Sequence, residues 1–477
     1  MHCKNYSNIH RYSMYICSMY KLNLKIMKAI WLFSLLAISS ISGVAQSLEK
    51  SIDSLMGLYF KPNGAGAVVL VAKDGQIIYN KAFGMANLEL DVPMKKEMVF
   101  EIGSMTKQFT AVSILMLLEQ GKLSLDDDIK KYVENYPTDS GKVTIHNLLN
   151  HTSGIKDLPF MDWVSFSATK KEYVALDFIN YAKKEPLSFK PNEKWDYSNM
   201  GYIILGYIIE KTSGMKYQDF LQKNIFDVLH MKYSYCRVGL PNVLIKNRAY
   251  GYDKNEVYYN ADFLEMSQGF SAGCILSTTE DLYKWNNGLQ NNTLLKKETL
   301  QKAFTNYTLN NGDKTSYGYG FLIKDINGSE SFEHGGGIPG FASHGIYLAN
   351  EKVYVVALSN CRYNNPAYEA TNIAALVINK PFKPKKELHL DKKQASEYLG
   401  DYKHADGTVL VVSLDTLKLY VQRKDRKYIR SQLIPFEKDK FYVENEFTIY
   451  EFKRNEKKEI IELIHRTRFK ENRLVKQ

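Results

Sequence analysis

A proline- and charge-rich segment, residues 381–387, divides the chain into two parts with different sequence patterns. Before it, apolar stretches with helical and strand-like spacing alternate along the chain. After it, the apolar residues fall into short strand-like runs at 409–412, 417–422, 440–443, 447–452 and 459–464. Runs of this length and spacing predict a small antiparallel barrel or sandwich. The segment between the two parts is typical of a linker.

We therefore expect four parts: an N-terminal extension with a signal peptide (1–45), a main domain (46–382), a linker (383–393) and a small antiparallel β domain (394–477). In the main domain, the periodicity predicts a hairpin over 66–86, a helix over 105–120 and a helix over 202–209. It also predicts strands within 331–360 and a final helix over 367–378. Ser277 and Glu280 have the spacing of a capping box that opens another helix.

The composition, 45% hydrophobic and 24% charged among 477 residues, is that of an ordinary globular protein. It excludes a disordered, collagen-like or coiled-coil chain. The net charge of +11 resides in the first 45 residues and in the segment from residue 384 onward, so the part between them is neutral. Because the main body carries no net basic charge, nucleic acid is not an expected partner.

Residues 21–45 have the layout of a secretory signal peptide. Lysines precede the apolar run 29–38, and small residues follow it, which places cleavage near Ala45. The apolar run is too short for a permanent transmembrane helix, and an uncleaved anchor is the alternative. We expect a periplasmic or secreted protein without stable membrane insertion after cleavage. Met27 is an alternative translation start, and the sequence does not indicate an oligomeric state.

The cysteines form no recognisable framework. Cys236, Cys274 and Cys361 follow the predicted signal, and their wide spacing fits neither a disulfide scaffold nor a metal site. His146 and His151 lack a partnering carboxylate motif, and we interpret His151 as a residue that braces a loop. Neither a metal ion nor an organic cofactor is expected.

The candidate nucleophile is the serine of a Ser-x-x-Lys motif. The chain contains this pattern six times, but only Ser104 begins a long apolar helix directly after a hydrophobic segment. Because residues i and i+3 share one helix face, the Lys107 amine is expected beside the Ser104 hydroxyl. Burial and the positive end of the helix both lower the pKa of a lysine, which favours its use as a base. Taken alone, the motif fits a helix-capping serine beside a surface lysine better than it fits a nucleophile beside a base.

Tyr197 and Asn199 form a second motif, Tyr-x-Asn, between a loop-like stretch and an apolar helix. A phenol at this place can relay a proton from the serine to a leaving group. The asparagine can hold a substrate amide oxygen. A buried tyrosine beside a turn asparagine is the plainer interpretation of this motif alone.

Three consecutive glycines follow His334, just before a predicted strand. Glycine lets the backbone approach a ligand closely, as the edge strand of an oxyanion hole requires. We therefore expect His334, Gly335 and Gly336 to contact substrate. A glycine-rich turn beside an exposed histidine is the alternative for this motif alone.

Together, the motifs and their flanking residues are specific. Segments 102–111, 148–154, 197–202, 277–282 and 334–341 closely resemble the serine β-lactamase-related family, which includes class C β-lactamases, D,D-peptidases, D-aminopeptidases and esterases. The resemblance implies an α/β fold of the α+β type, in which helices flank an antiparallel sheet built from both ends of the domain. It also implies an all-helical subdomain that carries Tyr197. Residues 397–402 resemble, more loosely, the start of the lipocalin-like domains that follow such hydrolases in bacteria.

The resemblance further implies a role for each motif residue. Ser104 is expected to be the acylated nucleophile, Lys107 its activating partner and Tyr197 the proton shuttle. Asn199 would contact Lys107 and the substrate amide. The backbone N–H groups of Ser104 and Gly337 would form the oxyanion hole.

Three positions depart from the family pattern. His334 stands where β-lactamases have a lysine, and a neutral imidazole attracts a substrate carboxylate less than an ammonium does. That difference argues against efficient antibiotic hydrolysis. Asn192 replaces a frequent glycine, and asparagine tolerates the left-handed conformation that such a turn requires. Cys274 replaces a usual glycine for no reason visible in the sequence.

The expected function is that of a secreted serine hydrolase that forms an acyl-enzyme on amide, ester or lactam carbonyls. D-amino-acid peptides and small esters are the favoured substrates. A non-catalytic module that binds cell-wall peptides is one alternative. A lipase-like hydrolase is another, because Ser271 lies in a Gly-x-Ser-x-Gly pattern, although the residues before it are not strand-like.

Overall fold

The computed structural model describes residues 46–137, 141–157, 172–239, 243–255, 257–425, 430–444, 446–468 and 471–477. The predicted signal peptide lies outside these residues. The first 57 residues form a unit of their own, of which residues 46–57 are described and helical. The second unit, residues 58–477, contains all the other elements. Among the helices of the described residues, none combines the length and the apolar character needed to cross a bilayer.

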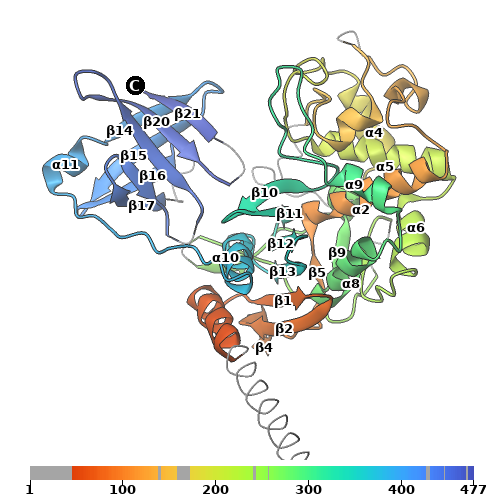
Figure 1. Cartoon of the computed structure of the whole chain (residues 1–477), viewed down its shortest axis with the longest axis horizontal. Coiled ribbons are helices and arrows are strands. Elements are labelled where there is room, and N and C mark those ends of the chain that lie inside the picture. Colours follow the sequence, from red (N-terminus) through yellow and green to blue (C-terminus); the bar gives the residue numbers. More distant parts are fainter. Residues whose placement is uncertain are drawn as a thin grey trace, which may run out of the picture. The chain divides into compact units, whose positions relative to one another are not determined.

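A six-stranded antiparallel sheet forms the centre of the main domain (Figure 1). In spatial order its strands are β10 (Leu322–Ile326), β11 (Ser329–Ile338), β12 (Phe341–Leu348), β13 (Val353–Ser359), β1 (Ala67–Lys73) and β2 (Gln76–Phe83). β1, from the start of the domain, pairs with β13, from its end, so that Val69 lies opposite Ala357. The predicted antiparallel sheet built from both ends of the domain is confirmed.

The centre of this sheet is apolar on both faces. Every residue of β13 is buried, as are all residues of β1 except the last. A continuous apolar run is what a strand covered on both sides requires. Helix α10 (Ala367–Val377) covers one face, and α8 (Thr279–Gln290) covers the other (Figure 1).

Helix α8 begins one residue later than the capping-box spacing predicts. The Thr278 side chain accepts a hydrogen bond from the Asp281 backbone N–H at 3.1 Å and is therefore the N-cap. Ser277 instead ends strand β9 (Ile275–Ser277). The strand pairing of Ser277 with Phe100 takes precedence over its local capping preference.

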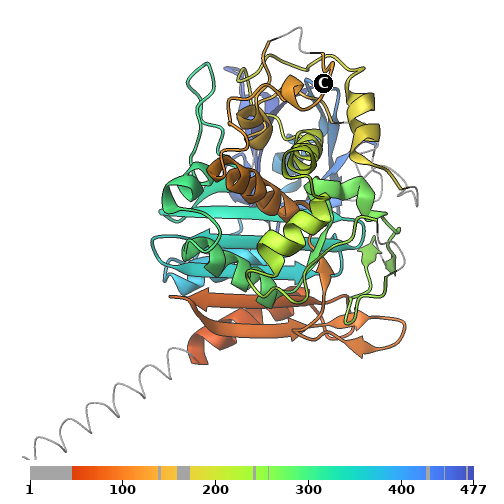
Figure 2. The same ribbon diagram turned by 90° about the vertical axis from the view of Figure 1, so that its right-hand side faces the viewer.

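The remaining part of the main domain is largely helical (Figure 2). Its elements are η1 (Gly103–Met105), α2 (Thr106–Glu119), η2 (Ile129–Lys131), α3 (Ile145–Leu149), α4 (Ala175–Ala182), α5 (Asn199–Ser213), α6 (Tyr217–Leu221), η4 (Gln222–Phe226), α7 (Met266–Gly273) and α9 (Lys297–Ala303). α5 packs against α2, α3, α4 and α7. Because α2 is buried over most of its length, its sequence is apolar on nearly all sides rather than striped. The predicted helical subdomain is confirmed.

Three small sheets complete the main domain. The first pairs β3 (Met85–Asn87) with β4 (Val92–Pro93). The second has β9 between β5 (Phe100–Glu101) and β6 (Tyr235–Cys236). The third pairs β7 (Tyr252–Lys254) with β8 (Tyr258–Asn260). The second of these sheets leads into the first motif. Directly after β5, the Ile102 N–H donates to the Ile275 carbonyl at 3.0 Å, which fixes the backbone just before Ser104.

Beyond the linker, helix α11 (Lys392–Ser396) precedes a closed eight-stranded antiparallel barrel. Its strands are β14 (Gly400–His404), β15 (Val409–Asp415), β16 (Lys418–Arg423), β17 (Arg430–Glu437), β18 (Lys440–Tyr442), β19 (Ile449–Arg454), β20 (Ile460–Arg466) and β21 (Glu471–Lys476). β14 pairs with both β15 and β21, which closes the barrel. Of the two architectures predicted for this part, barrel or sandwich, the barrel is present.

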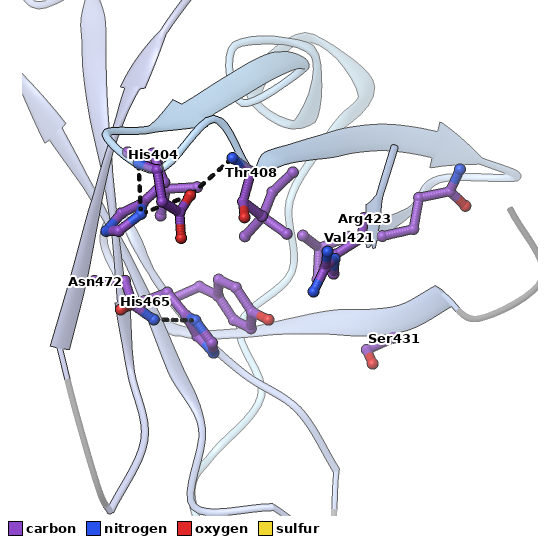
Figure 3. A pocket seen from close by; sticks show the side chains of 12 residues that line it. His404, Thr408, Val421, Arg423, Ser431, His465 and Asn472 are labelled. Carbon is purple, nitrogen blue, oxygen red and sulfur yellow. Dashed lines mark hydrogen bonds and ion pairs between the residues drawn. The ribbon is translucent and has the colours of Figure 1, made fainter. Parts of the chain in front are cut away.

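One end of the barrel holds a pocket of about 370 Å³ (Figure 3). Leu410, Val421 and Leu474 contribute apolar surface to it. Some of the polar groups of the pocket are paired with one another. His404 Nδ1 lies 2.9 Å from the Asp406 carboxylate, and His465 Nδ1 lies 3.4 Å from the Asn472 amide.

Candidate active site

Ser104 lies in η1, a single turn that contacts β11, β12, β9, α2 and α7. It therefore precedes the first turn of α2 instead of beginning that helix. Gly103 has φ +51°, a left-handed conformation that glycine adopts without strain. Lys107 is the second residue of α2, and the three-residue spacing brings its Nζ to 3.2 Å from Ser104 Oγ.

The Lys107 side chain is completely buried, with 0% of the residue exposed. Its Nζ lies 3.2 Å from Ser104 Oγ, 2.8 Å from Asn199 Oδ1 and 2.9 Å from the Ala272 carbonyl oxygen. None of these three groups carries a charge. Burial therefore lowers the pKa of Lys107 to about 7, while the negative charge of Asp157 acts in the opposite direction.

These three contacts determine how a neutral amine is oriented. The Asn199 side-chain oxygen and the Ala272 carbonyl only accept hydrogen bonds. The two N–H groups of a neutral Lys107 are therefore directed at them. Its lone pair then faces the Ser104 hydroxyl, which can donate. A deprotonated Lys107 is thus aligned to remove the Ser104 proton.

Asp157 fixes the Asn199 amide in the orientation that this arrangement needs. Its Oδ2 accepts a hydrogen bond from Asn199 Nδ2 at 2.9 Å, which turns Asn199 Oδ1 toward Lys107. Its Oδ1 accepts from the Ser198 hydroxyl at 3.0 Å and from the Met200 N–H at 2.9 Å. A carboxylate at the start of α5 is also favoured by the helix dipole. Asp157 was not predicted from the sequence. Its only signal there is its position three residues after Gly154, the last residue of the 148–154 segment.

Tyr197 precedes the N-cap of α5 and completes the group of side chains around Ser104. Its ring centroid lies 4.8 Å from Lys107 Nζ, and the nearby Ser104 side chain acts to lower the pKa of its phenol. Burial is the main cause that raises the pKa of the Tyr197 phenol. At neutral pH the phenol therefore keeps its proton, while Lys107 readily loses one. This difference suits Lys107 to the role of a base and Tyr197 to that of a proton donor.

His151 holds the Tyr197 segment in place, as its interpretation as a loop-bracing residue predicts. Its Nδ1 accepts a hydrogen bond from the Ser198 N–H at 3.1 Å, and its ring lies 4.4 Å from the Tyr197 ring. Burial lowers the pKa of His151 well below its usual value, so the ring is neutral. Asn192 in the adjacent turn has φ +63°, the left-handed conformation expected of it.

His334 is buried next to Tyr197, and both of its ring nitrogens have partners in the protein. Its Nδ1 lies 2.6 Å from the Gly335 carbonyl, which can only accept, so Nδ1 carries the proton. Its Nε2 lies 3.0 Å from the Tyr317 hydroxyl and accepts from it. Burial and the Lys107 charge lower the pKa of His334 to about 3. The imidazole is neutral at physiological pH and would have to exchange the Tyr317 hydroxyl for a substrate group.

The glycines after His334 let β11 approach the Ser104 turn. A Cβ on Gly336 would lie 2.0 Å from the Ile102 carbonyl oxygen, so only glycine fits there. A Cβ on Gly103 would lie 3.1 Å from the Gly337 backbone nitrogen, which places the two backbones side by side. The predicted oxyanion-hole residues, Ser104 and Gly337, therefore belong to adjoining segments.

Ser271, the serine of the alternative Gly-x-Ser-x-Gly pattern, is fully buried in α7. Its hydroxyl donates to the Tyr202 carbonyl at 2.8 Å. A Cβ on Gly206 would lie 2.1 Å from Ser271 Oγ, so this hydroxyl fills space against α5. A nucleophile elbow instead presents its serine at the end of a strand, exposed to substrate. The surroundings of Ser271 are those of a structural serine.

The structure thus brings Ser104, Lys107, Tyr197, Asn199 and His334 together from segments far apart in the sequence. Gly335 and Gly336 lie on the same strand as His334. Within the described ranges, no group of three or more His, Cys, Asp or Glu side chains is placed to hold a metal ion.

Comparison with known proteins identifies relatives of this chain. Residues 48–380 match the family model described as Beta-lactamase. A penicillin-binding protein of Bacillus subtilis (strain 168) is 32% identical over 437 residues, which cover 85% of this chain and 95% of that protein. The match to this relative extends past the linker into the barrel.

Solved structures show the same similarity. The octameric penicillin-binding protein homologue from Pyrococcus abyssi superposes with a TM-score of 0.64 at 28% identity, covering 90% of this chain and 99% of that one. The D-amino acid amidase from Ochrobactrum anthropi SV3 superposes with a TM-score of 0.62 at 22% identity, covering 70% and 99%. The second match shows a shared fold.

Proposed function

Because the chain belongs to the β-lactamase family of serine hydrolases, we propose that Ser104 forms an acyl-enzyme on amide, ester or lactam carbonyls. The observation that carries this proposal is the buried Lys107 amine, 3.2 Å from Ser104 Oγ. Its pKa of about 7 allows it to lose its proton at physiological pH. A serine hydroxyl is a weak nucleophile until such a base is beside it.

In the first half of the reaction, Ser104 Oγ attacks the substrate carbonyl carbon while Lys107 takes the hydroxyl proton. The bond to the leaving group breaks, and Tyr197 donates its proton to that group. Lys107 then returns a proton to Tyr197, whose ring centroid lies 4.8 Å from Lys107 Nζ. Backbone N–H groups of Ser104 and Gly337 stabilise the developing oxyanion. Water releases the acyl group by the reverse route, activated in turn by Lys107.

We further propose that substrates are D-amino-acid peptides, their amides or small esters. The solved relative of the same fold from Ochrobactrum anthropi is described as a D-amino acid amidase. The uncharged state of His334 favours the amides and small esters within this class, because a neutral imidazole offers no ion pair to a substrate carboxylate. Amides and esters without a free carboxylate next to the reacting carbonyl should therefore be preferred over β-lactam antibiotics.

We also propose that the protein acts outside the cytoplasm. Support comes from the charged, apolar and small-residue pattern of residues 21–45. N-terminal sequencing of the protein released by bacterial cells would test cleavage near Ala45 and the alternative start at Met27.

The decisive experiment measures covalent adducts by intact-mass analysis. The wild-type protein is incubated separately with a fluorophosphonate, a penicillin and a D-Ala-D-Ala peptide. Ser104→Ala and Ser271→Ala are the matched variants, each removing one hydroxyl. We expect the fluorophosphonate adduct and the turnover of a nitrophenyl ester to disappear in Ser104→Ala and to persist in Ser271→Ala.

The same experiment tests the alternative function, a non-catalytic module that binds cell-wall peptides. Such a module would bind the peptide without forming an adduct or releasing product. Loss of activity in Ser271→Ala alone would instead point to the lipase-like mechanism. Either result would overturn the proposal.

A further inference from the structure

Two cysteines that the sequence keeps far apart meet in the interior of the main domain. Cys236 Sγ and Cys274 Sγ lie 2.7 Å apart, although 38 positions separate the residues in the chain. Non-bonded heavy atoms prefer separations of about 3.5–4.0 Å, whereas the sulfurs of a disulfide lie about 2.0 Å apart. The two thiols are therefore closer than ordinary packing favours.

The backbone holds the two residues side by side. Cys236 ends β6 and lies opposite Ile275 of β9, the residue that follows Cys274. The Arg237 N–H donates to the Cys274 carbonyl at 3.4 Å, which extends this pairing by one residue. A covalent bond between the sulfurs therefore requires a movement of less than an ångström, without rearrangement of the strands.

We propose that Cys236 and Cys274 form a disulfide bond when the protein folds in an oxidising environment. This pair also accounts for Cys274, which stands where the family usually has glycine. The third described cysteine, Cys361, is buried in a different cluster, with Ala65 and Tyr252, and stays a thiol. The wide sequence spacing that excluded a disulfide scaffold does not exclude this single bond.

The bond forms by two thiol–disulfide exchanges with a small disulfide such as oxidised glutathione. One cysteine thiolate attacks a sulfur of the small disulfide, forms a mixed disulfide and expels one thiol. The second cysteine attacks the mixed disulfide, closes the protein bond and expels the other thiol. The protein loses two electrons and two protons, and the small disulfide gains them. Cys236 is 6% exposed and Cys274 is 0% exposed, so exchange takes place before the interior closes.

The bond would fasten a segment that supports the active site. Cys274 follows Ala272 by two residues, and the Ala272 carbonyl holds Lys107 Nζ at 2.9 Å. The same segment contains Phe270, whose φ of 35° and ψ of −136° interrupt α7. A cross-link between Cys274 and Cys236 of β6 restrains this strained segment in the folded protein. It also limits the conformations that the unfolded chain can adopt.

The test is peptide mapping of the full-length wild-type chain without reduction. One preparation is secreted into the periplasm of an expression host, and a second is made in the reducing cytoplasm. Free thiols are alkylated before trypsin digestion. In the periplasmic preparation we expect peptide 233–237 linked to peptide 255–284, lighter by two hydrogen atoms than the sum of the two thiol peptides. Peptide 353–362, which contains Cys361, should be alkylated in both preparations.

Stability and matched variants complete the test. The periplasmic wild type should melt several degrees above its fully reduced form. Cys236→Ser and Cys274→Ser should each lack the linked peptides and melt near the reduced wild type, whereas Cys361→Ser should keep the link. The proposal is overturned if the folded periplasmic wild type carries alkylated Cys236 and Cys274, or if either residue is linked to Cys361 or glutathione.

Discussion

The group of residues around Ser104 and the pocket in the C-terminal barrel both gather ionisable side chains, but they treat charge in opposite ways. Lys107 is fully buried among neutral hydrogen-bond partners, so burial lowers its pKa to about 7. The Asp406 side chain is 61% exposed and lies 2.9 Å from His404. Hydrogen bonds from the Thr408 N–H and from His404 lower the pKa of Asp406 to about 2.

The two shifts have different chemical consequences. Lys107 is moved toward its neutral form and can exchange a proton at physiological pH, which is the condition for a general base. Asp406 is held more firmly in its charged form and cannot take part in proton transfer near pH 7. The shifted pKa therefore suits the site around Ser104 to proton transfer, whereas in the barrel pocket it reflects the pairing of Asp406 with Thr408 and His404 (Figure 3).

Among the ionisable side chains of these two regions, the buried amine should be the most costly to replace. Lys107→Met keeps a long side chain but removes the base, and we expect kcat/KM for a nitrophenyl ester to fall by about 10³-fold or more. The melting temperature should stay the same or rise, because the cost of burying an amine disappears. Enzyme kinetics and thermal unfolding measure the two effects. Near-wild-type kcat/KM in a folded variant would mean that Lys107 is a structural residue like Asp406.

The phenol of Tyr197 should matter next, and more for some substrates than for others. Tyr197→Phe removes the proton donor while leaving Lys107 and Ser104 in place, so we expect about a 10²-fold loss of kcat with an amide substrate. A nitrophenyl ester has a leaving group that needs no proton, so the loss of kcat with this substrate should be smaller. Equal losses on both substrates would contradict the role of Tyr197 as donor to the leaving group.

Much of this arrangement could be predicted from the sequence, because the motifs combine local spacing with recognisable surroundings. The i, i+3 relation of Ser104 and Lys107 correctly places the amine beside the hydroxyl. The apolar run of β1 and the strand-like runs after the linker correctly indicate a sheet and a β domain. Each of these features depends on neighbours within a few residues or on a clear pattern of apolar residues along the chain.

The features that the sequence did not predict depend on contacts between distant segments. Asp157 acts only because α5 ends up beside its loop, 42 residues later in the chain. Tyr317, which occupies His334 Nε2, lies 17 residues before it in the chain. The meeting of Cys236 and Cys274 requires the pairing of β6 with β9. Such contacts leave no periodic or motif signal in one sequence.

Replacement of Asp157 should change kcat/KM by an intermediate amount, because its negative charge acts on the Lys107 amine. The negative charge of Asp157 raises the pKa of Lys107, so Asp157→Asn should lower that pKa further below 7. For the wild type, kcat/KM should rise with pH up to about 7 and then level off, because only the neutral amine is a base. In the variant this acid limb should move to lower pH.

The loss of orientation at Asn199 should lower the plateau of the Asp157→Asn profile by about tenfold. Asp177→Asn, which removes an acidic group that accepts a hydrogen bond from the exposed Val174 N–H, is the control. A reduced plateau with an unmoved acid limb would show that Asp157 only supports the fold of α5.

The smallest effect is expected in the barrel pocket. Because the pKa of Asp406 is about 2, below its unfolded value near 4, its charge stabilises the fold above pH 4 and loses that effect as the pH falls toward 2. Asp406 is exposed, so solvent screening limits the contribution to less than about 1 kcal/mol. Asp406→Asn should therefore lower the melting temperature slightly at pH 7, match the wild type at pH 2, and leave kcat/KM unchanged. A clear loss of kcat/KM in this variant would show that the barrel pocket contributes to the reaction and that exposed, paired charges in this protein can serve function as well as structure.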